Sequence, residues 1–143
     1  MSEPIAPLLS TALSELAGLL LSTASFTELV QEVAELTVRT VTSVVTCGVT
    51  LAQQDRVFTV AAADELASQL DEQQYDIGDG PCLQALGSGE IVDAADLCAE
   101  SRWGDYPSIA MGHGILAIYS VPLIVDGKPV GVLNVYAGTT NAF

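Results

Sequence analysis

The clearest local structural signal in this chain is ILAIYSVPLIVDGKPVGVLNVYA, residues 115–137. Two apolar runs rich in β-branched residues, 115–125 and 129–137, flank the dipeptide Asp126-Gly127. Because Asp-Gly readily adopts the positive φ angles of a two-residue turn, the stretch predicts a hairpin of two antiparallel strands. Apolar side chains fall on both alternating faces of the first run, which indicates a sheet that is covered on both sides.

The segments before this hairpin predict helices first and further strands after them. Residues 8–20 carry apolar side chains at three- and four-residue steps, which is typical of an amphipathic helix. Ser25 and Glu28 form a capping-box pattern that begins a second helix. Residues 44–51 and 57–63 are rich in β-branched residues and predict another hairpin.

The segment between the two hairpins is more polar and predicts short elements. Residues 64–73 and 81–86 predict two short helices, and residues 91–103 predict a loop with one short strand. The whole pattern predicts an α+β domain with a central antiparallel sheet. We expect the N-terminal helices on one face of the sheet and the short elements of residues 64–112 on the other.

Length and charge limit what the chain can be and bind. Its 143 residues suit one structural domain, in which we expect residues 1–43 to form a helical pair and residues 44–143 to form the sheet and a pocket. The formal net charge is −14, from 18 acidic and 4 basic side chains. So few cations cannot neutralise a row of phosphates, and we expect neither nucleic-acid nor membrane binding by this chain.

The cysteines and the start of the chain predict a cytoplasmic protein without a metal site. Cys47, Cys82 and Cys98 are odd in number and form no C-x-x-C pair, which favours free thiols in a reducing compartment. With a single histidine, they make no standard zinc site. The apolar start follows Glu3 rather than a basic stretch, unlike a secretory signal peptide.

Four strings of the chain, in this order and spacing, resemble the GAF domain family. They are VFTVAAADEL (57–66), YDIGDGPCLQAL (75–86), DLCAESRW (96–103) and YSVPLIVDGKPVGVLNVY (119–136). The likeness is to the actinobacterial type that often precedes an RNA-binding ANTAR module. It implies a GAF/PAS-like sheet with a pocket on one face, roofed by the segment between the second and fourth strands. It also implies a terminal helix after Phe143 and an output domain outside the chain.

Residues expected to floor or roof that pocket are the candidate ligand site. Aromatic side chains with a polar tip orient ligands in mostly apolar sites, although ordinary core packing explains them as well. Of the 18 acidic side chains, 12 lie between Asp55 and Asp105, which favours a neutral or cationic ligand over an anion, unless they only form a solvated face. The ligand-binding candidates are Tyr75, Gly80, Pro81, Cys82, Asp96, Trp103, Tyr106 and Tyr119.

Cys82 is the most chemically distinctive candidate. Proline is favoured at the first position of a helix, so Pro81 places Cys82 in a first turn, where free backbone N–H groups stabilise a thiolate. However, the nearby carboxylates of Asp76 and Asp79 raise the pKa of a thiol. Free cysteines are also among the most buried residues, so a structural role is favoured over a redox role.

Two further ligands follow from the resemblance and are disfavoured by this sequence. Some GAF sensors hold haem through one histidine before the fourth strand, and His113 is the single histidine here. Residues 111–114 predict a flexible loop, which suits an exposed side chain. GAF domains that bind cyclic nucleotides carry an Asn-Lys pair, whereas Asn134 is followed here by Val135.

We predict a non-enzymatic regulatory module, because no nucleophile–base pair and no paired carboxylates stand out. It would sense a small molecule or mediate dimerisation, and a pocket filled by side chains would leave only the second role. The apolar surface of residues 8–20 predicts a homodimer through the N-terminal helices. The alternative is a thiol enzyme similar to free-methionine-sulfoxide reductase, a GAF protein with cysteines around its pocket. Cys82 fits that pattern, but residues 111–115 lack the second cysteine expected before the fourth strand.

Overall fold

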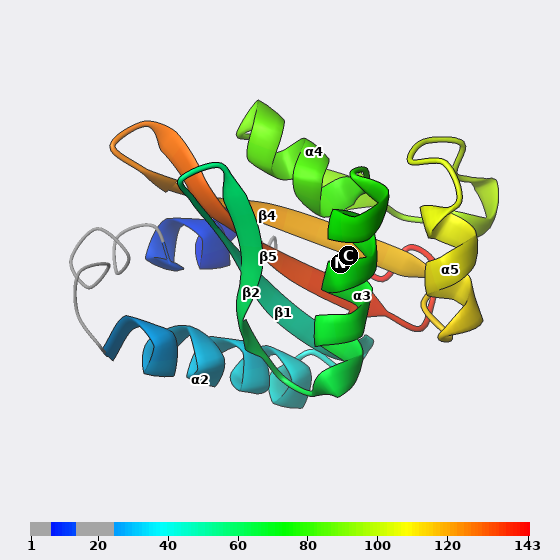
Figure 1. Ribbon diagram of the computed structural model, residues 1–143. Coiled ribbons are helices and arrows are strands. Elements are labelled where there is room, and N and C mark those ends of the chain that lie inside the picture. The colour runs from blue at the N-terminus through cyan, green and yellow to red at the C-terminus, as the bar shows by residue number, and fades with distance from the viewer. Residues whose placement is uncertain (1–6, 14–24) are drawn as a thin grey trace.

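A five-stranded antiparallel sheet forms the centre of the computed structural model, which describes residues 7–13 and 25–143. The strand order is β2-β1-β5-β4-β3, and every neighbouring pair is antiparallel. The elements are α2 (Ser25–Thr40), β1 (Val44–Gln53), β2 (Arg56–Ala62), α3 (Glu65–Ile77), α4 (Pro81–Ser88), β3 (Val92–Ala94), the 3-10 helix η1 (Leu97–Ala99), α5 (Tyr106–Gly112), β4 (Ala117–Val125) and β5 (Lys128–Ala137). The predicted α+β class is confirmed (Figure 1).

The hairpin around Asp126-Gly127 forms as its sequence predicts. Asp126 and Gly127 have φ angles of 51° and 76°, and Val125 pairs with Lys128 across the turn. β5 then pairs with β1, where a Cβ on Gly131 would lie 2.4 Å from the carbonyl oxygen of Thr50. Only glycine permits this close approach of two strands.

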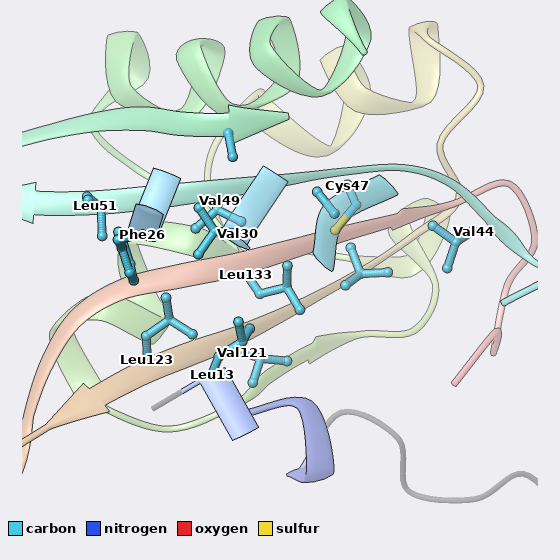
Figure 2. Close-up of a cluster of buried hydrophobic side chains, with 13 residues drawn as sticks. Leu13, Phe26, Val30, Val44, Cys47, Val49, Leu51, Val121, Leu123 and Leu133 are labelled. Carbon is cyan, nitrogen blue, oxygen red and sulfur yellow. The ribbon is translucent and has the colours of Figure 1, made fainter. Parts of the chain in front are cut away.

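The sheet is covered on both faces, as the apolar pattern of β4 indicates. On one face, which we call the helix face, α2 and residues 7–13 pack against β1, β4 and β5 (Figure 1). Figure 2 shows this core, with Phe26 and Val30 of α2 close to Val49 and Leu133 of the sheet. On the other face, which we call the cap face, α3, α4 and α5 cover the same strands.

The helical start of the chain is described only in part. Residues 7–13 are helical, and Leu13 is buried in the core of the helix face. Residues 14–20 of the predicted first helix, and the Ser25 side chain of the capping box, lie outside the described residues. Within the described part of the chain, no helix is long and apolar enough to cross a membrane.

Two elements differ from the sequence prediction. α3 continues to Ile77, where Gly78 ends it in the left-handed conformation with φ 78° and donates its N–H to the carbonyl of Gln74. Residues 111–114 are not simply a flexible loop, because Met111 and Gly112 complete α5. This short helix is held by burial of Tyr106, Pro107 and Ala110, a tertiary effect that local sequence does not reveal.

Candidate functional site

α3 carries a carboxylate into the space between itself and the sheet. Its buried residues are Ala67, Leu70, Asp71 and Gln74, which recur at three- and four-residue steps and therefore share one face. Asp64 begins the helix by accepting a hydrogen bond from the N–H of Ala67, at 3.2 Å. The face of α3 that packs against the sheet is apolar except for Asp71 and Gln74. An ionisable side chain, that of Asp71, therefore enters the core of the cap face.

The sheet makes room for Asp71 at Gly48 of β1. A Cβ on Gly48 would lie 2.5 Å from Oδ2 of Asp71, closer than real Cβ atoms approach an oxygen. The Asp71 side chain is fully buried. A glycine on the strand and an acid on the helix therefore form one packed unit.

Asp71 is hydrogen-bonded only by neutral groups. Its Oδ1 atom accepts from the Tyr136 hydroxyl and from Nδ2 of Asn134 at 3.1 Å, and its Oδ2 atom accepts from the Thr59 hydroxyl at 2.9 Å. The chain has four cationic side chains, Arg39, Arg56, Arg102 and Lys128, and all four are exposed. Within the residues that the structure describes, a fully buried carboxyl group is thus held without a counter-ion.

Burial raises the pKa of Asp71 from 3.8 to about 7, because the interior solvates a carboxylate poorly. The hydrogen bonds from Tyr136, Thr59 and Asn134 oppose this shift, and the nearby Glu72 carboxylate adds to it. A carboxyl with this pKa exists in both protonation states near neutral pH. Its charge will therefore respond to anything that changes its surroundings.

The hydroxyl of Thr50 connects Asp71 to Tyr75 and Cys82. It lies within hydrogen-bond distance of the Tyr75 hydroxyl, accepts from Nδ2 of Asn134 at 3.1 Å, and is 3.3 Å from Sγ of Cys82. The Tyr75 hydroxyl is also 2.9 Å from the Thr59 hydroxyl. We call the connected set the Asp71 cluster, and its members are Thr50, Thr59, Asp71, Tyr75, Cys82, Asn134 and Tyr136.

Cys82 is buried and held in its thiol form. It occupies the second position of α4, after Gly80 and Pro81, so the predicted place in a first helical turn is confirmed. Its backbone N–H donates to Oε1 of Gln74 at 2.9 Å, so a neutral amide already satisfies that N–H group. Burial, and next the charge of Asp71, raise the pKa of the thiol to about 12. Cys82 is therefore not the activated thiolate of a typical redox cysteine.

The other two cysteines also lack the features of a reactive pair. Cys47 is buried among the apolar side chains of the helix face, where burial raises its pKa far above the ordinary value. Cys98 is exposed in η1. All three cysteines are free, while Cys82 is 0 % exposed.

The loop before α5 closes the cap face through aromatic side chains. Trp103 is 5 % exposed and donates its indole N–H to Oε1 of Gln84 in α4, at 2.9 Å. The Arg102 guanidinium lies 4.2 Å from the centre of the Trp103 ring and pairs with Glu100. Tyr106 is fully buried and donates to the carbonyl of Leu70, at 2.9 Å. The loop is thus fastened to α4 through Trp103, and the first residue of α5, Tyr106, is fastened to α3.

The structure brings six of the eight candidate ligand residues to the cap face. These are Tyr75, Gly80, Pro81, Cys82, Trp103 and Tyr106. Asp96 instead begins η1, where it accepts from the N–H of Cys98 at 3.0 Å. Tyr119 differs from the expectation, because strand alternation turns it to the helix face, where its ring centre is 5.1 Å from that of Phe143.

The sequence prediction missed the polar centre of the cap face. Asp71, Thr50, Thr59 and Asn134 were not among the candidates, and Gln74 was not either. A signal for Asp71 exists in its helical spacing from Ala67, Leu70 and Gln74, which places it on a buried stripe. His113, the histidine considered for haem, is exposed just after α5. Within residues 7–13 and 25–143, no cluster of acidic, cysteine or histidine side chains is arranged to hold a metal.

Comparison with known proteins places the chain in a family. A model of the GAF domain matches residues 23–143, so the chain belongs to the GAF domain family. No curated protein sequence matches significantly. The family assignment therefore rests on the domain model and on the fold.

Solved structures with the same fold include methionine sulfoxide reductases and a GAF domain in an inactive state. The structure of fRMsr of Staphylococcus aureus in complex with substrate is 19% identical, with a TM-score of 0.68, and the match covers 100% of this chain and 86% of that one. The type II free methionine-R-sulfoxide reductase from Thermoplasma acidophilum is 18% identical, with a TM-score of 0.63 and coverage of 92% and 81%. The crystal structure of the A. aeolicus nlh2 GAF domain in an inactive state is 13% identical, with a TM-score of 0.60 and coverage of 92% and 80%. At these identities the likeness establishes the fold alone.

Proposed function

We propose that the chain is a non-enzymatic regulatory GAF domain whose small-molecule site is the Asp71 cluster. One observation carries the proposal: a fully buried carboxyl group, bonded only to neutral donors, lies between the sheet and its helical cap. Burying an ionisable group without a counter-ion costs stability, so a purely structural core would be better served by an apolar side chain. A role in recognition would explain the presence of the acid here.

The chemistry of the cluster favours a small cationic or neutral polar ligand. A protonated amine or a guanidinium group would supply the positive charge that Asp71 lacks, while the hydroxyls of Thr50, Thr59 and Tyr75 offer further hydrogen bonds. An anion would be repelled by Asp71. Because side chains occupy the space, the ligand would enter by displacing the cap, whose Trp103 is fastened to α4 through one hydrogen bond to Gln84.

A ligand panel with matched charges tests this proposal. Native mass spectrometry of freshly purified protein first reports any retained molecule. Thermal-shift titrations then compare small primary amines with the amides and carboxylates of the same carbon skeleton. We expect stabilisation by an amine in the wild type and a loss of that effect in Asp71→Asn, which keeps the size of the side chain and removes its charge. Equal responses of the two proteins would contradict the proposal.

A thiol enzyme is the second candidate, because structures of methionine sulfoxide reductases share this fold and Cys82 follows Gly80-Pro81. Burial of the Cys82 thiol, with its raised pKa, argues against it. We expect no turnover of free methionine sulfoxide with a thiol reductant. Turnover that is abolished by Cys82→Ser would replace the first proposal by this one.

Dimerisation through the N-terminal helices is a further part of the proposed function. Leu8 of residues 7–13 is 64% exposed and Leu36 of α2 is 50% exposed, so apolar side chains near the start of the chain face outward. Burial of such surface by a second copy would stabilise a symmetric dimer. Sedimentation at micromolar concentration should give a dimer. A folded monomer would contradict this part of the proposal and leave the ligand site untouched.

We also propose a cytoplasmic setting in which the domain controls an output module. The likeness of the four sequence strings to GAF domains that precede ANTAR modules supports RNA-directed transcription control. Ligand binding at the Asp71 cluster would then alter the packing of the helix face. The assignment would be contradicted if the natural gene product carried no nucleic-acid-binding module and formed no stable complex with a protein that has one.

A further inference from the structure

A second surface of the molecule, which meets the Asp71 cluster at Thr59, runs along the outer edge of the sheet. β2 is the first strand in the order β2-β1-β5-β4-β3, and within the described part of the chain no strand pairs with its outer side. It lies between α2 and α3 (Figure 1). An open groove with a volume of about 420 Å³ follows this edge, lined by Gln31, 59–62, Asp64, Glu65 and Ser68.

Main-chain groups of β2 point outward along this edge of the sheet. Gln53 and Arg56 close a two-residue turn between β1 and β2, so they form the first hydrogen-bonded pair of the hairpin. Alternation in an antiparallel ladder then directs the N–H and C=O groups of Val57 and Thr59 away from β1. The edge therefore offers donors and acceptors in the arrangement that another strand would use.

One end of this edge already binds a group that resembles a peptide bond. The side-chain amide of Gln31 donates to the carbonyl of Ala62 at 2.6 Å and accepts from the N–H of Ala62 at 3.0 Å. A primary amide that donates and accepts at one residue reproduces the contacts of a neighbouring strand. Gln31 thus marks the place of a peptide group beside β2.

The charge around the groove selects the kind of strand. Asp64 and Glu65 line it on the α3 side, and Glu35 accepts from Nε2 of Gln31 on the α2 side, at 3.0 Å. None of the residues that line the groove is cationic. A second copy of this chain would bring the same carboxylates to the same place, so self-pairing is disfavoured by repulsion.

From this geometry we infer that the β2 edge binds an extended, basic segment of a partner protein, which adds a strand beside Val57 and Thr59 and displaces the Gln31 amide at Ala62. Main-chain hydrogen bonds would give the affinity, and alternating Lys or Arg side chains would face the rim carboxylates. The Thr59 hydroxyl bonds both Asp71 and Tyr75, so the added strand would lie beside a residue of the Asp71 cluster. The binding itself does not depend on a ligand in that cluster.

Three short peptides test this inference on the whole chain. The probe is a capped peptide of alternating lysine and valine. Its binding is measured by fluorescence anisotropy of the peptide and by amide hydrogen exchange of the protein. We expect binding, with exchange at Val57 and Thr59 slowed about tenfold, which corresponds to one or two added hydrogen bonds. The same peptide with every backbone nitrogen methylated keeps its charge but has no main-chain N–H group to donate, and a glutamate–valine peptide reverses the charge, so neither should bind.

Variants of the groove sharpen the result. Asp64→Asn with Glu65→Gln should weaken binding of the lysine peptide roughly threefold, as expected for exposed rim charges. Glu90→Gln removes one exposed charge outside the groove and should change nothing. Gln31→Ala should tighten binding roughly threefold, because the peptide no longer displaces the Gln31 amide.

Four outcomes would overturn the inference. If the N-methylated peptide binds as tightly as the unmethylated lysine peptide, binding comes from the negative charge of the chain and not from main-chain hydrogen bonds. If amide hydrogen exchange at Val57 and Thr59 slows as the protein concentration is raised without any peptide, the β2 edge pairs with a second copy of the chain. Absence of binding by the lysine peptide to a correctly folded protein, or unchanged or weaker binding in Gln31→Ala, would also contradict it.

Discussion

The two faces of the sheet are filled in opposite ways. On the helix face, β1, β4 and β5 meet α2 mainly through apolar side chains such as Val30, Val49 and Leu133, and the hydrogen bonds between Gln31 and Ala62 add to this packing at the β2 edge. On the cap face, the same strands carry Thr50 and Asn134 into a connected set of polar groups around Asp71. Apolar packing thus dominates the helix face, whereas the cap face combines an apolar cluster with a polar centre whose burial costs free energy.

The largest effect is expected from a cavity on the helix face. Leu133→Ala should lower the free energy of unfolding by about 2–5 kcal/mol, because Leu133 is fully buried and its removal leaves a void. Urea denaturation followed by circular dichroism measures the change. Ile77→Ala is the control, because Ile77 is 40% exposed at the end of α3 and should lose no more than about 0.5 kcal/mol.

The next effect should be a pH dependence that belongs to the cap face. The folded pKa of Asp71, about 7, lies above its value of 3.8 in the absence of structure, so the folded state binds the proton more strongly. Asp71 therefore favours folding most below pH 4, and this contribution is lost as pH rises from about 4 to 7. The loss is on the order of 4 kcal/mol, at about 1.4 kcal/mol per pKa unit.

Asp71→Asn isolates this effect from the general repulsion within a chain of net charge −14. Urea midpoints of both proteins should be measured across the pH range, and the wild type should lose more stability than the variant between pH 4 and 7. Parallel curves would show that Asp71 keeps an ordinary pKa. The groups that influence this titration include Glu72, Tyr136, Thr59 and Asn134.

A smaller effect is expected from two tyrosines on opposite faces. Tyr136→Phe removes a donor to Asp71 and an acceptor for Nε2 of Gln74, so it should cost about 1–3 kcal/mol of unfolding free energy and raise the pKa of Asp71 further. Tyr119→Phe makes the same chemical change on the helix face. It should cost less than about 0.5 kcal/mol, since the Tyr119 ring packs on Phe143. Similar losses in both variants would remove the contrast between the faces.

The smallest effect concerns thiol labelling of the native protein. Cys98 is exposed, while Cys47 and Cys82 are buried on opposite faces. Iodoacetamide at mildly alkaline pH should therefore give one adduct by mass spectrometry, and denaturant should give three. Rapid native labelling of Cys82 but not of Cys47 would reveal opening of the cap face.

Local sequence could predict the frame of the domain but not its polar centre. Asp126-Gly127 fixes a hairpin by local conformation, and Pro81 fixes the start of α4 in the same way. Asp71, Thr50 and Asn134 meet only because α3 packs over β1 while β1 pairs with β5, where Gly48 lies opposite Asn134. Such a meeting depends on register and packing across distant segments, which no single spacing in the sequence encodes.

The protonation of Asp71 can be followed residue by residue in solution. Carboxyl carbon chemical shifts from isotope-labelled aspartate, assigned by comparison with Asp71→Asn, report its protonation by NMR. If Asp71 is a buried carboxyl without a counter-ion, its signal will titrate with a midpoint near 7. A midpoint at or below its ordinary value of 3.8 would contradict the account, because it would require solvent or a cation beside the carboxylate.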